Sequence, residues 1–230
     1  MKHKNLWFLS LALLAVLFYT ACSSNPEKTL LDKYFHALSM NDNQTMASIA
    51  VEPMAIEAVS FKILSVSPEI VEPFSLPDLN QAEVEAKKKM DEHVGPVVEA
   101  KDALDMAQEE LDNARTSGSR AALKKKVAEL QAKYDEEYNA HKELQTQYSA
   151  SKEAAAQEEQ VALFSLGQKS LPGIREMSGE VHSKTVQISV KTKSGAEKEY
   201  NVLMKRYILK DQTGNPNPGR WIIVKFEPVA

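Results

Sequence analysis

The 230-residue sequence has few of the residues that mark disulfide-stabilised, metal-binding or phosphate-binding proteins. Its single cysteine, Cys22, excludes an internal disulfide and any site with several thiolate ligands. Its eight glycines form no G-x-G-x-x-G phosphate loop and no G-x-S-x-G nucleophile turn. Its five histidines form no H-E-x-x-H pair. The sequence therefore favours a protein that is not an enzyme, and it predicts neither a cofactor nor a catalytic residue.

Basic charge and long apolar runs are also scarce. Acidic residues outnumber basic residues by 32 to 28, and removal of an N-terminal segment carrying Lys2 and Lys4 changes the net charge from −4 to −6. A nucleic-acid-binding domain needs a basic surface, so this class is excluded. Beyond Cys22 the sequence contains no apolar run of the roughly 20 residues that a membrane-spanning helix requires.

The one long apolar run lies directly before the cysteine. A short basic head precedes the uncharged stretch Leu6–Tyr19, and two small residues then separate this stretch from Cys22. This three-part layout is typical of a secretory signal peptide, and the run is short for a membrane span of about 20 residues. A plain secretory peptide cut after Ala21 and an uncleaved anchor are the simpler interpretations.

The segment YTAC resembles the lipobox of bacterial lipoproteins, although Tyr19 stands where that family prefers leucine. The resemblance implies that residues 1–21 are a signal peptide, and that Cys22 is acylated and begins the mature chain. Residues 22–27 would then be a lipidated tether. Each buried methylene of an acyl chain adds about 0.8 kcal/mol, so several chains would hold the protein at a membrane. Ser23, in place of an aspartate, favours the periplasmic face of the outer membrane.

Apolar patterns before and after the middle of the chain predict an α+β domain. Helical spacing in PEKTLLDKYFHALS predicts a helix, and a second short helix is expected at residues 46–50. Alternating apolar residues predict a strand at 60–66, ended by Pro68 and Pro73. The same alternation predicts three later strands, at residues 180–192, 197–210 and 220–227.

The segments YFHALSMNDNQTMASIA, FKILSV and GRWIIVKFEP, in this order, resemble small bacterial lipoproteins of the nuclear-transport-factor-2-like superfamily. This resemblance implies a curved antiparallel sheet around N-terminal helices, forming a cone with an apolar pocket. The superfamily contains enzymes and non-enzymes, so its fold does not decide function. About 110 residues separate the first strand from the second here, where the family has a short loop. We therefore expect a discontinuous domain of residues 28–78 and 166–230.

Residues 79–165 predict a long antiparallel coiled-coil hairpin, inserted between strand 1 and strand 2. Apolar and alanine positions repeat every seven residues on both sides of a turn at residues 116–119. The shortness of the turn makes the two helices antiparallel neighbours. Gly95-Pro96 interrupts the first arm and is expected to bend or restart it.

The turn also fixes which residues of the two arms face each other. Centring it on Ser117 places His93 opposite His141, close to Glu137. The simpler interpretation is a polar layer that fixes the register of the hairpin. A pH-sensitive or metal-binding pair is the alternative, which makes His93 and His141 weak metal candidates because two ligands rarely suffice.

Three functional classes remain compatible with the sequence. The favoured one is an envelope lipoprotein, held at the membrane by its acyl chains, that acts as a non-catalytic interaction module and contacts a protein partner through the hairpin. The second is a periplasmic adaptor of a transport or secretion system, although the lipoyl-like half-motifs of such adaptors are not reproduced. The third is an enzyme that uses the cone pocket, for which no inward Asp or His can be assigned. The sequence leaves the oligomeric state open.

Overall fold

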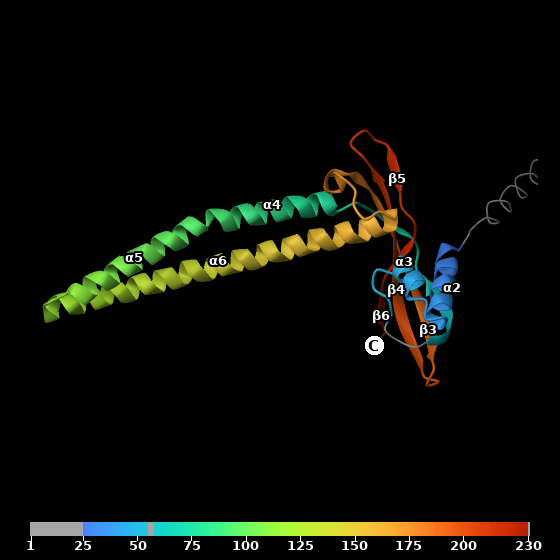
Figure 1. The fold of residues 1–230 in the computed structure, drawn as a ribbon, viewed down its shortest axis with the longest axis horizontal. Helices are drawn as coiled ribbons and strands as arrows, with labels where there is room; N and C mark the ends of the chain where they lie inside the picture. The colour runs from blue at the N-terminus through green and yellow to red at the C-terminus, as the bar shows by residue number, and fades with distance from the viewer. Residues whose placement is uncertain (1–24, 55–57, 230) are drawn as a thin grey trace, which may run out of the picture. The chain divides into compact units, whose positions relative to one another are not determined.

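A computed structural model describes residues 25–54 and 58–229 and has an α+β architecture (Figure 1). The described elements, in chain order, are helices α2 (Pro26–Ser39) and α3 (Asn43–Ile49), strands β1 (Ala58–Val66) and β2 (Ile70–Pro73), helices α4 (Leu76–Glu92), α5 (Val94–Asn113) and α6 (Ser117–Leu166), the short 3-10 helix η1 (Ile174–Glu176), and strands β3 (Ser178–Thr192), β4 (Glu197–Lys210), β5 (Pro216–Pro218) and β6 (Ile222–Pro228).

The strands form one antiparallel sheet. Strand β3 pairs with β1, β2 and β4, while β4 also pairs with β5 and β6. Phe61 lies opposite Val190 and Ile63 opposite Ile188, so their side chains share the apolar face of the sheet. The pairing of β1 with β3 confirms the prediction that the early strand joins the C-terminal strands.

The chain divides into two compact units. The first contains the residues up to Ile70, Ser183–Arg206 and the residues from Trp221 onward, and the second contains Val71–His182 and Tyr207–Arg220. Strands β3 and β4 contribute residues to both units. In the described part of the chain, no helix combines the length and the apolar character that crossing a membrane requires.

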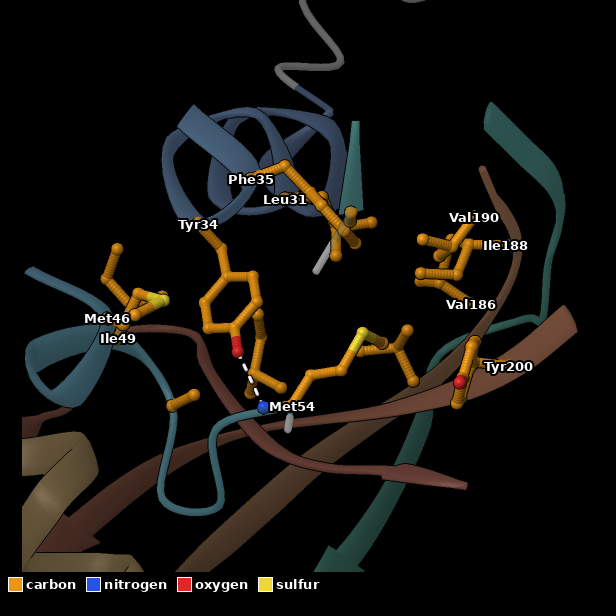
Figure 2. Packing of buried hydrophobic residues seen from close by; sticks show 14 of the residues in the cluster. Leu31, Tyr34, Phe35, Met46, Ile49, Met54, Val186, Ile188, Val190 and Tyr200 are labelled. Carbon is orange, nitrogen blue, oxygen red and sulfur yellow. Dashed lines mark hydrogen bonds between the residues drawn. The ribbon is translucent and has the colours of Figure 1, made fainter. Parts of the chain in front are cut away.

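The first unit has an apolar core between its two helices and its strands (Figure 2). Leu31 and Tyr34 of α2 and Ile188 of β3 are fully buried in this core, and burying an aliphatic side chain such as Leu31 or Ile188 contributes about 1.5–3 kcal/mol. The hydroxyl oxygen of Tyr34 accepts a hydrogen bond of 2.7 Å from the backbone N–H of Met54. This bond fixes the segment that follows α3, and burial raises the pKa of the Tyr34 hydroxyl.

The second unit is dominated by its long helices, because both α4 and α5 pack along α6 (Figure 1). Lys126 of α6 forms an ion pair with Glu110 of α5, and Glu137 pairs with His93, so residue numbers rise along one arm as they fall along the other. The arms are therefore antiparallel neighbours.

Buried and half-buried positions recur along these helices at intervals of four and three residues. Along the first arm, from α4 to the residue after α5, the series is Ala86, Met90, His93, Val97, Ala100, Leu104, Ala107, Leu111 and Ala114. On α6 the series is Leu123, Val127, Leu130, Tyr134, Glu137, His141, Leu144, Tyr148, Ser151 and Ala155. Each series follows one face of its helix, so the arms contact each other along a narrow seam.

The first arm is interrupted where the sequence predicts. Helix α4 ends at Glu92 and α5 begins at Val94. Pro96 has no N–H to donate to the carbonyl of Glu92, and its ring clashes with that carbonyl in a continuous helix. The series of shielded positions passes through His93 without changing its spacing. The break therefore leaves the same face of both helices against α6.

Three local predictions need correction. The turn between the arms is Ala114–Thr116 rather than residues 116–119, because the side chain of Thr116 accepts a hydrogen bond from the N–H of Ser119 and caps α6. Residues 70–73 form β2 after Pro68, so the long helices follow the second strand rather than the first. Residues 216–218, for which no strand is predicted, form the short strand β5 against the end of β4.

Candidate functional site

The predicted lipidation site, Cys22, lies outside the described residues. The candidate site that the structure does describe is the polar layer of the helical arms, which we define as His93, Glu137 and His141. The rings of His93 and His141 stack with 6.1 Å between their centroids and 19° between their planes. The predicted juxtaposition of these two histidines is therefore confirmed.

Local structure places each member of the polar layer. His93 occupies the single residue between α4 and α5, whereas Glu137 and His141 lie one turn apart on the shielded face of α6. The Nε2 atom of His93 lies 3.2 Å from an oxygen of Glu137, and these two side chains are 22% and 28% exposed. The carboxylate thus pairs with the imidazole of the other arm.

The polar layer is only partly satisfied. The Nδ1 atoms of His93 and His141 are buried and have no hydrogen-bond partner among the described residues. An unpaired buried polar atom costs about 1–3 kcal/mol, so this layer stabilises the arms less than an apolar layer would. Any misaligned register would set its polar groups against the apolar side chains of neighbouring layers. The arrangement therefore favours one register at some cost in stability.

The polar layer lacks a third converging ligand for a metal ion. Within residues 25–54 and 58–229, no group of three or more His, Cys, Asp or Glu side chains is placed to hold one. Glu137 already pairs with His93, and stacked rings direct their nitrogens along parallel planes rather than toward a common point. The geometry therefore supports a structural polar layer better than a metal centre.

A second group of polar side chains connects α4, α6 and η1 at the ends of the arms farthest from the turn. Arg175 of η1 donates from Nε to Glu159 of α6 at 2.7 Å, and from Nη1 to Glu83 of α4 at 2.8 Å and to Asn80 at 3.2 Å. Hydrogen bonds to Glu159 and Glu83 raise the pKa of Arg175. One guanidinium therefore joins three elements, as its fixed fork of donors permits. No pattern in the sequence indicates this contact, because 92 residues separate Arg175 from Glu83.

A buried serine attaches the end of α6 to the strands of the second unit. Ser165 is 1% exposed, and its hydroxyl donates to the carbonyl of Arg220 at 2.7 Å and accepts from the N–H of Tyr207 at 3.2 Å. Tyr207 in turn donates its hydroxyl to Glu158 at 3.0 Å, and burial raises the pKa of that hydroxyl far above its ordinary value. Both hydroxyls are occupied by structural hydrogen bonds, so neither is placed as a nucleophile.

Two surface hollows do not add a catalytic arrangement. One, of about 350 Å³, is lined by the last turns of α6 and the residues after it, including Glu159, Phe164 and Lys169. The other, of about 490 Å³, lies beside the start of β4 and includes Glu199 and Tyr200. Neither is lined by a histidine or a cysteine, and their ionisable lining residues are glutamates, lysines and Tyr200.

Comparison with known proteins adds no functional assignment. The chain matches no protein-family model, no curated protein and no solved structure.

Proposed function

We propose that this chain is a lipid-anchored, non-catalytic binding module, and that α4, α5 and α6 form an antiparallel coiled-coil hairpin that contacts a protein partner. The alternating spacing of the shielded positions on α4, α5 and α6 is the observation that carries the proposal. Spacing of four and three residues over several heptads is typical of a coiled-coil seam.

A coiled-coil hairpin leaves most of its surface available for binding. Helix α6 has 50 residues and is therefore about 75 Å long at 1.5 Å per residue. Its seam with α4 and α5 covers one narrow face, and the remaining faces are exposed. Such a long, rigid element, with its base fixed by Arg175 and Ser165, suits contact with another macromolecule better than the enclosure of a small substrate.

Acylation of Cys22 would hold the first unit close to a membrane. Helix α2 begins at Pro26, and the four residues up to that point span at most about 14 Å. Glu27, in the first turn of α2, lies 3.7 Å from Lys184, which also pairs with Glu69 at 3.2 Å. These ion pairs fix the start of α2 on the first unit, so the tether would allow that unit little freedom at the membrane surface.

The remaining parts of the proposal concern location and domain structure. We place the protein on the periplasmic face of the outer membrane, with residues 28–78 and 166–230 as a discontinuous domain related to nuclear-transport-factor-2-like lipoproteins. A sheet with helices on one face supports this relation only at the level of α+β architecture. A non-catalytic role agrees with the structural use of the Ser165 and Tyr207 hydroxyls.

Photo-crosslinking in cells tests the binding role of the hairpin. A photo-reactive amino acid at Asn139, exposed on α6, should form adducts with another protein. The same amino acid at Lys191, exposed on β3, is the matched control and should form none. Adducts from Lys191 alone, or from neither site, would contradict the proposal. Adducts from Asn139 that contain a transporter or channel would instead favour the adaptor class.

A further inference from the structure

A second stripe of residues runs along α4 and α5, away from the seam. Its members are separated by four, three, four, three and four residues, so they share one face of the arm. We call this the flank stripe and define it as Lys87, Asp91, Val94, Val98, Lys101 and Asp105. All six residues are exposed, and Val94 and Val98 are 47% and 50% exposed. Because the shielded series keeps its spacing through His93, the flank stripe is also continuous across the break.

The flank stripe has an apolar centre and charged ends. Lys87 forms an ion pair with Asp91 on one side of the valines, and Lys101 forms one with Asp105 on the other side. The centre is sterically open, because a Cβ atom added at Gly95 would meet nothing within 4 Å. An apolar centre within a charged rim is the usual anatomy of a protein contact surface.

We propose that a second copy of this chain docks on the flank stripe, antiparallel to the first, about a twofold axis passing near Pro96. Such an axis sets Val94 opposite Val98 of the second copy, and the reciprocal pair follows by symmetry. The inference rests on the proposed function, since it identifies another copy of the chain as one partner of the hairpin.

The order of charges is what selects a second copy as the occupant. Under this symmetry Lys87 faces Asp105 of the second copy, and Asp91 faces Lys101 of the second copy. All four ionic contacts therefore join opposite charges, while each intrahelical ion pair can remain in place. A parallel arrangement in the same register would instead set every charge opposite its own kind, and like charges across an interface are disfavoured. The surface is thus complementary to itself in only one of these two directions.

A charge-swapped variant tests this pairing. Lys87→Asp, Asp91→Lys, Lys101→Asp and Asp105→Lys together keep both intrahelical ion pairs and the self-complementarity of the stripe. They set like charges opposite each other at all four contacts with the wild-type chain. Full-length chains carrying two different C-terminal tags are co-expressed, extracted in detergent and captured through one tag, and the second tag is then measured.

The expected result is that wild type captures wild type and swapped chain captures swapped chain, while mixed capture falls at least tenfold. Equal capture in the mixed combination, or no capture between wild-type copies, would overturn the proposal. Val98→Glu should also reduce capture at least tenfold, because it places a charge in the apolar centre. Met106→Glu is its control, since Met106 is 66% exposed on α5 but lies outside the flank stripe. Equal reductions of capture by Val98→Glu and Met106→Glu would also overturn the proposal.

The pairing and the anchoring can fail separately. Suppose that chains carrying Cys22→Ser leave the membrane, and that their capture still falls when one chain has the wild-type flank stripe and the other has the charge-swapped stripe. Both the anchoring and the pairing are then supported. If the wild-type chain is never acylated but discriminates, the anchoring is wrong and the pairing is correct. If the chain is acylated but does not discriminate, only the pairing is wrong.

Discussion

Replacement of Ser165 by alanine tests how α6 is attached to the strands of the second unit. The hydroxyl of this buried side chain is hydrogen-bonded to two backbone groups, the carbonyl of Arg220 and the N–H of Tyr207. Alanine removes both hydrogen bonds without adding volume. It leaves the N–H of Tyr207, a fully buried residue, without this acceptor, whereas Arg220 is an exposed residue.

The loss in free energy of unfolding depends on how many polar groups Ser165→Ala leaves without a partner. A buried polar group that loses its partner costs about 1–3 kcal/mol, and an ordinary hydrogen bond contributes about 0.5–1.5 kcal/mol, so losing the bonds to Tyr207 and Arg220 together costs about 1.5–4.5 kcal/mol. Part of this is offset because alanine has no hydroxyl to desolvate. Its higher helix propensity stabilises α6 by up to about 0.5 kcal/mol. We expect the free energy of unfolding to fall by about 2–4 kcal/mol.

Urea unfolding followed by circular dichroism measures this effect. A matched control is Ser149→Ala on the same helix, where the serine is exposed and its hydroxyl bonds only to the carbonyl of Gln145. The two substitutions change helix propensity equally, so their difference isolates the lost buried bonds. With a slope of about 2 kcal/mol per molar, Ser165→Ala should lower the midpoint by about 1–2 M relative to the control. Equal midpoints for the two variants would refute the role assigned to Ser165.

Three further substitutions are expected to destabilise the fold, to leave it neutral or stabilised, and to change its response to pH. Gly179→Ala should lower the free energy of unfolding by about 2–4 kcal/mol, because Gly179 has φ +147° and a Cβ there would lie 2.3 Å from the carbonyl oxygen of Ile208. Gly118→Ala, in open space within α6, should be neutral or stabilising by up to about 1 kcal/mol. Hydrogen bonds from Thr45 lower the pKa of Asp42, so the contribution of this cap is present at neutral pH and lost as the pH falls through the folded-state pKa. Asp42→Asn should therefore make melting temperature less sensitive to pH below about pH 5, and unchanged sensitivity would contradict this.

Periodic features of the fold were predictable from the sequence. The repeat that includes Leu104 and Ala107 predicted the face of α5 that lies against α6, and both residues are buried. The same repeat predicted that His93 would meet His141, because both residues occupy positions of the seam, although the turn lies earlier in the chain than predicted. Gly95-Pro96 marked the helix break, since proline removes a backbone donor.

Contacts between distant segments could not be predicted. Arg175 follows α6 in a short irregular segment, and nothing in its neighbourhood indicates that it will bridge Glu83 and Glu159. Strand β2 was missed because Pro73 argues against a strand. A strand accommodates proline, which has no backbone N–H, at a position whose N–H is not needed for pairing with the neighbouring strand. The pairing of His93 with Glu137 was not predicted, because side-chain direction at a helix break depends on backbone angles that the repeat does not fix.

Mass spectrometry of the N-terminal peptide, from protein extracted from the cell membrane, tests whether Cys22 anchors this chain. Acylation of Cys22 is the feature that would make this chain a membrane-anchored module. The proposal predicts that the mature chain begins at Cys22 and that this peptide carries the added mass of acyl chains. A peptide that begins at Cys22 without added mass, or one that retains Lys2, would contradict it.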